Sequence, residues 1–258
     1  MNSIFNFDYK IPIICTAIHN GHDLDLDFKD NIGISEADQL REEDPFTEYF
    51  TEITGNRIIN YTSRFQVDVN RNRSKAVYLK PNDAWGLSVR KKSPSKEMIE
   101  KSLKDYDTFY RRTEIFFKEM EKSFGTFFVY DIHSYNHRRN GPEADFDPIE
   151  ENPEINLGTS NIPPKWTNLI SVLGNDLSEF SINGRSFDTR FDVKFPGGPF
   201  ARWVHNTFPE TGCCISIEFK KIFMDEWTGK PDLEIMKQLK SALASTIPNI
   251  IKNLKEVL

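Results

Sequence analysis

Short runs of apolar and β-branched residues alternate with longer amphipathic segments along the chain. Three of these runs, Ile11–Ile18, Thr126–Tyr130 and Cys213–Phe219, have the length and the residue types of buried strands. A further strand is predicted at Arg57–Tyr61, and a short one at Ile155–Leu157. The predicted strands are therefore spread over the whole chain.

Helical patterns fill much of the sequence between these strands. The clearest is Ser95–Phe124, where apolar side chains recur at intervals of three, four and seven residues before Gly125 ends the pattern. Other helices are predicted from Ser35 to Leu40, from Pro45 to Gly55, from Trp166 to Leu173, from Asn175 onwards, and from Leu233 to Leu258 with an interruption or restart at Pro248. Loops are predicted at Asp23–Asp30, at the Gly197–Gly198 turn, and at Tyr135–Glu154, which has the length and polarity of a segment that covers an active site.

The alternation of strand and helix predicts the fold class. No repeat or low-complexity linker interrupts the 258 residues, so we expect a single domain, 1–258, with a three-layer α/β/α fold around a mixed, mostly parallel sheet. Ligands bind such folds at the carboxyl ends of the strands. His19, His133 and Glu218 lie at or near predicted strand ends, and we therefore expect them at one edge of the sheet.

Composition narrows the classes of function. The chain is 38% hydrophobic and 28% charged, as in ordinary soluble proteins. Its net charge is -6, and its sequence contains no long block of basic residues that would bind a phosphate backbone. Its three cysteines cannot form a disulfide framework. No basic region precedes the apolar run Ile11–Ile18, and this run is too short to cross a bilayer. We expect a cytoplasmic protein that binds neither nucleic acid nor membrane.

His19 and His133 suggest a metal site. Two strand-end imidazoles and one carboxylate are the smallest set of protein ligands for catalytic zinc, although a histidine there can equally be a hydrogen-bonded structural residue. The candidate carboxylates are clustered near the start of one predicted helix: Glu42, Glu43, Asp44 and Glu48. Acidic residues also favour that position because of the helix dipole, so spacing alone does not choose between them.

Two further groups carry candidate chemistry. Glu218 lies inside an apolar run, where a carboxylate is either functional or paired with a cation such as Lys220 or Arg202. Four polar residues lie close together in one short segment: Arg64, Asp68, Asn70 and Arg71. Arginine binds carboxylates in a bidentate manner, so this segment suits an anionic substrate, unless it is a solvated surface strand. The chain contains no phosphate-binding Gly-Lys-Ser/Thr loop and no Gly-x-Ser-x-Gly elbow.

Eight short motifs follow one another between about residues 11 and 226: His19-Asn-Gly21, Glu43-Asp44, Ser63-Arg64, Val67-Asp-Val-Asn-Arg71, Asp131-Ile-His-Ser134, Asn156-Leu-Gly-Thr159, Phe195-Pro-Gly-Gly198 and Ile217-Glu-Phe-Lys-Lys-Ile-Phe-Met224. Taken in this order, they resemble the N-formylglutamate amidohydrolase family. That family is related to the zinc carboxypeptidases and aspartoacylase, and its members hydrolyse N-acylated acidic amino acids. The resemblance implies the same phosphorylase/hydrolase-like α/β/α fold and a small N-acyl amino acid with a free carboxylate as substrate.

The resemblance also implies roles for individual residues. The zinc ligands fall on His19, His133 and Asp44, with Glu43 and Glu48 as alternatives for the acidic ligand. The carboxypeptidase-like His-x-x-Glu pattern is absent, because His22 occupies the position three residues after His19.

The catalytic and substrate-binding roles follow in the same way. Glu218 corresponds to the general base, and Arg64 to the arginine that polarises the scissile carbonyl. Asn70 and Arg71 correspond to the pair that holds the substrate carboxylate. We therefore expect a zinc-dependent amidohydrolase for a substrate such as N-formyl-L-glutamate. Two alternatives are a carboxypeptidase-like enzyme or deacylase for a larger N-acyl or peptide substrate, and a non-catalytic carboxylate-binding protein.

Overall fold

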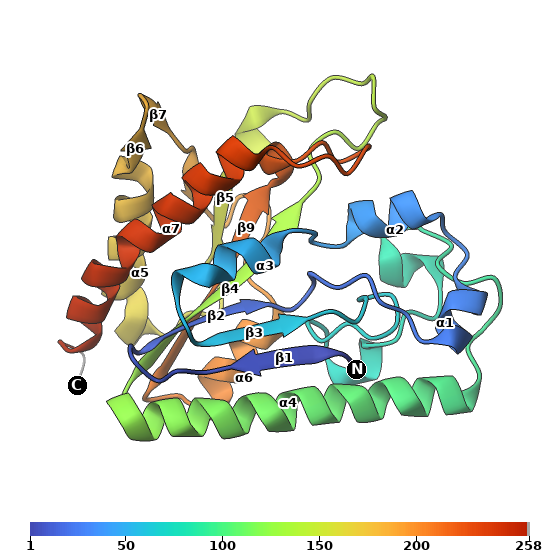
Figure 1. Ribbon diagram of the computed structural model, residues 1–258, viewed down its shortest axis with the longest axis horizontal. Helices are drawn as coiled ribbons and strands as arrows, with labels where there is room; N and C mark the ends of the chain where they lie inside the picture. The colour runs from blue at the N-terminus through green and yellow to red at the C-terminus, as the bar shows by residue number, and fades with distance from the viewer. Residues whose placement is uncertain (257–258) are drawn as a thin grey trace.

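A seven-stranded mixed sheet forms the centre of the protein in the computed structural model, which describes residues 1–256 (Figure 1). Its strands lie in the order β1-β3-β2-β4-β9-β5-β8. Their bounds are β1 (Ser3–Asn6), β2 (Ile13–Ala17), β3 (Arg57–Asn60), β4 (Phe127–Tyr135), β5 (Ile155–Gly158), β8 (Thr189–Phe191) and β9 (Gly212–Lys220). The four strands β3, β2, β4 and β9 are parallel, whereas β1 and β5 pair antiparallel with β3 and β9. The predicted α/β fold with a mixed, mostly parallel sheet is confirmed.

Helices cover both faces of this sheet. The helices are α1 (Leu26–Asn31), α2 (Glu36–Glu42), α3 (Thr47–Phe50), α4 (Lys96–Phe124), α5 (Thr167–Glu179), α6 (Pro199–Thr207) and α7 (Leu233–Leu254). The helices α4 and α6 lie on one face, and α3, α5 and α7 on the other (Figure 1). No helix within residues 1–256 has both the length and the apolar character needed to cross a bilayer.

The protein has a hydrophobic core on each face of the sheet, and alternating side chains of the central strands contribute to both. In β4, Phe127 and Val129 pack with α4 and α6, while Phe128 and Tyr130 pack with α5 and α7. Both faces of the strand are therefore apolar, and a continuous hydrophobic run is the expected pattern for such a strand. This is why the central strands could be recognised from the sequence.

The strand β4 is longer than its apolar pattern indicates. Pairing with β9 continues from Asp131 opposite Ser216 to Tyr135 opposite Lys220. The backbone ladder thus extends through polar residues, and His133 lies inside the strand, not beyond its end. The predicted loop consequently begins after Tyr135.

Several predicted boundaries were wrong for local reasons. The segment Asp23–Asp30 was predicted as a loop but contains the start of α1, a six-residue helix in which Phe28 is the one buried apolar side chain. The helix predicted from Pro45 begins at Thr47, because Phe46 adopts a left-handed conformation with φ 67°. The helix α6, which starts after the Gly197–Gly198 turn, was not predicted. Gly198 at its N-cap and Pro199 in its first turn are nevertheless typical of a helix start.

The helix α7 continues through Pro248 without the predicted interruption. Proline removes one backbone hydrogen bond and crowds the preceding turn. Here the buried side chains of Leu243 and Ile250, on either side of the proline, hold the helix against the sheet, and Thr246 contacts the Tyr130 hydroxyl at 2.6 Å. The predicted end of this helix at Leu258 lies outside the described residues.

The helix predicted in two parts around Asn175 is one continuous helix, α5. After it, β6 (Ser181–Ile182) and β7 (Arg185–Ser186) form a separate two-stranded hairpin beyond the end of α5 (Figure 1).

Candidate active site

Two histidines and one aspartate from distant parts of the chain meet at the edge of the sheet. His19 lies just beyond β2, Asp44 lies between α2 and α3, and His133 lies in β4. Asp44 Oδ2 is 3.4 Å from His19 Nδ1 and 3.0 Å from His133 Nδ1. All three side chains are buried, and their ligand atoms lie within 4.8 Å of one another. This cluster could hold a metal ion.

The backbone of Asp44 is fixed by contacts to two other elements. Its N–H donates to the His19 carbonyl at 3.0 Å, which ties the turn to the end of β2. The Thr47 hydroxyl donates to the Asp44 carbonyl at 2.7 Å. From the end of β9, the buried Lys221 ammonium donates to the carbonyl of Glu43 at 2.8 Å and to that of Arg41. These bonds satisfy carbonyls at the C-terminal end of α2 and hold the aspartate in place.

Each histidine has a second aspartate behind it. His19 Nε2 contacts Asp68 Oδ1 at 2.7 Å, and His133 Nε2 contacts Asp131 Oδ2 at 3.0 Å. The other oxygen of Asp131 accepts a hydrogen bond from the Thr16 hydroxyl at 2.7 Å. A carboxylate on Nε2 favours a proton on that nitrogen, so Nδ1 of each ring is the atom available to a metal.

The electrostatics of the cluster are consistent with a cation-binding centre. Burial alone would raise the pKa of Asp44, but hydrogen bonds from His133 and His19 outweigh it, and this pKa is lowered. Burial opposes the charge of His133, but Asp131 and Asp44 raise its pKa well above the usual value. Two imidazole nitrogens and one carboxylate oxygen form a donor set that suits zinc and leaves a coordination position open. The residues present therefore fit the metal that the family resemblance implies.

The two alternative acidic ligands point elsewhere. The Glu43 carboxylate accepts hydrogen bonds from Ser63 and, at 3.1 Å, from Gln39, and it contacts His22 Nδ1 at 2.6 Å. Glu48 accepts a hydrogen bond from the Tyr61 hydroxyl at 2.6 Å. Asp44 is therefore the acidic residue that the fold brings to the two histidines, and His22 is occupied by Glu43.

Glu218 lies beside His133, because the two residues are register partners in β9 and β4. No ion pair within residues 1–256 reaches its carboxylate. The two cations considered as partners bond elsewhere, Lys220 to the Asn152 carbonyl and Arg202 to the Asn161 side chain. Burial raises the pKa of Glu218 to about 7, helped by the nearby carboxylates of Asp44 and Asp131 and opposed by His133.

Asp68 organises the segment that carries the arginines. It is fully buried, and it accepts hydrogen bonds from Arg64 at 2.9 Å, from the Tyr78 hydroxyl and from the backbone N–H of Asn70 at 2.8 Å. Arg71 Nε lies 3.7 Å from the same carboxylate. The segment is thus a folded loop around a buried anion, and the alternative of a solvated surface strand is wrong.

Asn70 is held where a glycine leaves room for it. Its side-chain oxygen accepts a hydrogen bond from the Phe200 N–H at 3.0 Å, at the start of α6. A Cβ atom at Gly198 would lie 2.4 Å from that oxygen. A residue with a side chain at position 198 would therefore displace the side chain of Asn70.

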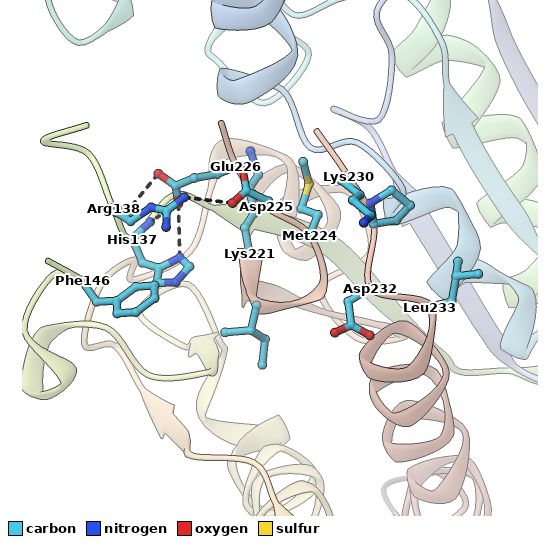
Figure 2. Close-up of a pocket in the computed structure, with 12 residues that line it drawn as sticks. His137, Arg138, Phe146, Lys221, Met224, Asp225, Glu226, Lys230, Asp232 and Leu233 are labelled. Atoms are coloured by element: carbon cyan, nitrogen blue, oxygen red, sulfur yellow. Dashed lines mark hydrogen bonds and ion pairs between the residues drawn. The ribbon is translucent and has the colours of Figure 1, made fainter. Parts of the chain in front are cut away.

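All seven predicted site residues line one cavity of about 220 Å³. They are His19, Asp44, Arg64, Asn70, Arg71, His133 and Glu218. The cavity is also lined by Glu42, which the sequence offered only as a candidate metal ligand, and by residues that the sequence did not single out, chiefly Trp85, Asn136, Arg139 and Lys221. The basic and aromatic character of residues 135–140 was the available signal for Arg139. A larger neighbouring cavity of about 620 Å³ shares Lys221 with it (Figure 2).

Three candidate metal ligands lie next to a partly buried glutamate that no ion pair within residues 1–256 reaches, and a metal-dependent hydrolase could use such a set of groups. The chain belongs to the N-formylglutamate amidohydrolase family, whose model matches residues 11–224. This confirms the resemblance found in the sequence motifs. The family and the fold together support an amidohydrolase, which acts on carbon–nitrogen bonds other than peptide bonds.

Solved structures share the fold at low sequence identity. N-formylglutamate amidohydrolase from Ralstonia eutropha JMP134 matches with a TM-score of 0.74 and 13% identity, covering 100% of this chain and 98% of that one. A gene product from Agrobacterium tumefaciens matches with a TM-score of 0.64 and 17% identity, covering 93% and 92%. A metallo-carboxypeptidase from Pseudomonas aeruginosa reaches a TM-score of only 0.34, at 14% identity and covering 98% and 60%, and supports no conclusion here. No curated protein matches the chain in sequence.

Proposed function

We propose that this protein is a zinc-dependent amidohydrolase that cleaves the amide bond of an N-acyl acidic amino acid, with N-formyl-L-glutamate as the leading substrate. The observation that carries the proposal is the cluster of His19, Asp44 and His133 beside Glu218 in one cavity. The family's own name supports the choice of substrate. We also propose that residues 1–258 form a single catalytic domain.

His19, Asp44 and His133 would hold the metal through Nδ1, Oδ2 and Nδ1. Zinc bound there would supply Lewis acidity toward the acyl oxygen and toward a water molecule. The protein's contribution is to keep these three donors in place, through Asp68 and Asp131 behind the rings.

Glu218 would move the proton. The carboxylate takes a proton from the attacking water as the oxygen–carbon bond forms. It then gives that proton to the nitrogen as the carbon–nitrogen bond breaks, so that a carboxylic acid and a free amine form, which ionise to a carboxylate and an ammonium ion. In the protein without metal, burial raises the pKa of this carboxyl to about 7, so the group can exchange a proton near neutral pH.

Arg64 would bind the acyl oxygen, where negative charge develops in the transition state. Its guanidinium is already oriented, by the hydrogen bond to Asp68 and by stacking on Trp85 at 4.8 Å from the ring centroid. Because the group is held before substrate arrives, little reorganisation is required during the reaction. Asn70 and Arg71 would bind the carboxylate of the amino acid moiety.

The test is the hydrolysis of N-formyl-L-glutamate, N-acetyl-L-glutamate, N-formyl-L-methionine and a peptide cleaved at its C-terminus. Release of the free amine is measured for each of the four substrates. We expect N-formyl-L-glutamate to give the highest kcat/KM, with activity lost on treatment with a chelator and regained on addition of zinc. Preference for the peptide or for a larger acyl group would replace the proposal with the carboxypeptidase-like or deacylase alternative. Zinc-loaded protein that hydrolyses none of the panel would contradict it.

A further inference from the structure

The catalytic cavity has two separate cationic walls. One consists of Arg64 and Arg71, which share the buried carboxylate of Asp68. The other consists of Arg41 and Arg139, which share the carboxylate of Glu42. The first wall provides the arginines already assigned to the acyl oxygen and to one substrate carboxylate. The second wall has no role in the proposed reaction.

Glu42 does not depend on Arg139 for its partners. Its side chain is 4% exposed and accepts a hydrogen bond from the Asn136 amide at 3.1 Å, while Arg41 lies at 3.5 Å. The contacts of Arg139 to both Glu42 oxygens are at 3.5 Å, longer than the 2.7–2.9 Å typical of a charge-assisted bond. Arg139 can therefore leave Glu42 without stranding a buried charge.

Arg139 is also the member of this wall that solvent and ligand reach most easily. Its side chain is 41% exposed, against 12% for Arg41. It lies on the segment that follows β4 and lines the same cavity as His133. A weakly held, exposed guanidinium at the rim of a catalytic cavity is suited to bind a carboxylate in a bidentate manner.

We propose that Arg139 is a specificity-determining residue that binds the second carboxylate of a dicarboxylate ligand. This deepens the proposed function and rests on it: in an N-acyl acidic amino acid the second carboxylate is that of the side chain. The first cationic wall would then bind one carboxylate of the departing amino acid, and the second wall would bind the other.

The neighbouring residue supplies a matched control. Arg138 faces the other cavity, where its guanidinium pairs with Asp225 at 2.9 Å and lies near the ring of Phe146 (Figure 2). Its backbone N–H donates to Glu226 at 3.2 Å. Two adjacent arginines on one loop therefore point into two different cavities, and the same substitution can be made in each.

The first test compares Arg139→Gln with Arg138→Gln on N-formyl-L-glutamate and on its neutral isostere, N-formyl-L-glutamine. We expect Arg139→Gln to lower kcat/KM for the glutamate substrate by about 10- to 100-fold, mainly through KM, because a carboxylate remote from the reacting bond contributes equally to ground state and transition state. The glutamine substrate should change less than about threefold, and Arg138→Gln should change neither. Equal losses on both substrates would overturn the assignment.

A binding measurement separates this inference from the proposed function. Calorimetric titration of the zinc-loaded protein with glutarate and with glutarate monoamide should show a preference for glutarate that disappears in Arg139→Gln and persists in Arg138→Gln. If the parent hydrolyses no N-acyl amino acid but shows this pattern, the proposed function fails and the role of Arg139 stands. If the parent hydrolyses N-formyl-L-glutamate but keeps its glutarate preference in Arg139→Gln, the role of Arg139 is wrong and the function stands.

Discussion

The orientation of the two imidazole rings decides which atoms face the centre of the site. Nε2 of each ring lies on an aspartate, and Nδ1 of each ring lies within 3.4 Å of Asp44. An aspartate behind a ligating histidine fixes its tautomer and increases its basicity. Asp68 and Asp131 are therefore expected to act on the metal through the rings.

The first prediction concerns Asp131. Asp131→Asn should weaken zinc binding by about 10- to 100-fold, because an amide neither fixes the His133 tautomer as strongly nor adds negative charge to the ring. Competition with a chromogenic chelator measures the change. Thr16→Val, which removes only the hydrogen bond to Asp131, is the milder control and should have the smaller effect. An unchanged zinc affinity in Asp131→Asn would show that this carboxylate does not tune the site.

The second prediction concerns Glu218. Glu218→Gln should keep zinc at the parent's stoichiometry while lowering kcat by two or more orders of magnitude, because the amide cannot move a proton. The two readouts are elemental analysis and formate release on the same preparation. Normal turnover in the variant would remove Glu218 from the proton-transfer role.

At the scale of elements, the site is assembled by the connections between strands and helices. His19 and His133 come from neighbouring parallel strands, so the sheet itself brings them together. Asp44 comes from a turn between two short helices, and its position depends on bonds to the ends of β2 and β9. Lys221 makes the long-range hydrogen bonds, from the end of β9 to the carbonyls of Arg41 and Glu43.

The third prediction compares two adjacent lysines. Lys221→Met should weaken zinc binding several-fold, because it leaves the carbonyls of Arg41 and Glu43 without their buried donor and loosens the turn that carries Asp44. Lys220→Met removes a bond to the Asn152 carbonyl and should leave zinc affinity unchanged. Equal effects of the two substitutions would contradict the positioning role of Lys221.

The elements that could be predicted are those whose sequence pattern matches their burial. The central strands are apolar on both faces, and α4 has one apolar stripe, so hydrophobic periodicity located them. Short elements such as α1 show no hydrophobic period, because Phe28 is the one buried apolar side chain among its six residues. The extension of β4 through Asp131 and His133 could not be predicted either, because its polar side chains are satisfied by partners from other elements.

The same distinction applies to the site. Motif order located the two histidines, Asp44 and Glu218, because each lies in or next to a recognisable element. The roles of Glu42, Arg139 and Lys221 depend on contacts across 90 or more positions of the chain, such as that between Arg139 and Glu42. No local pattern encodes such a contact, and only the fold makes it visible.

At the scale of the whole molecule, the charged groups of the site affect the stability of the fold. Without a metal, Glu218 is a partly buried carboxylate whose pKa of about 7 lies above its ordinary value of 4.5. Between these pH values the folded chain binds more protons than the unfolded chain, so this group's contribution to stability falls as pH rises from about 4.5 to 7.

The fourth prediction follows from that sign. In metal-free protein, Glu218→Gln should raise the free energy of unfolding at pH 8 by up to about 3 kcal/mol, because the amide removes the cost of a buried charge. At pH 4.5 to 5 the gain should largely disappear, since the native carboxyl is then protonated. Thermal unfolding of the chelator-treated parent and variant at both pH values measures this. A gain that does not depend on pH would indicate a packing effect instead.

The most direct measurement of the central claim is the zinc content of the purified chain, determined by elemental analysis in parallel with the His133→Ala variant. Three protein ligands and an open position predict about one zinc per chain in the parent and almost none in the variant. A parent that contains no zinc and takes none up, or a variant that holds as much as the parent, would contradict a metal centre at His19, Asp44 and His133.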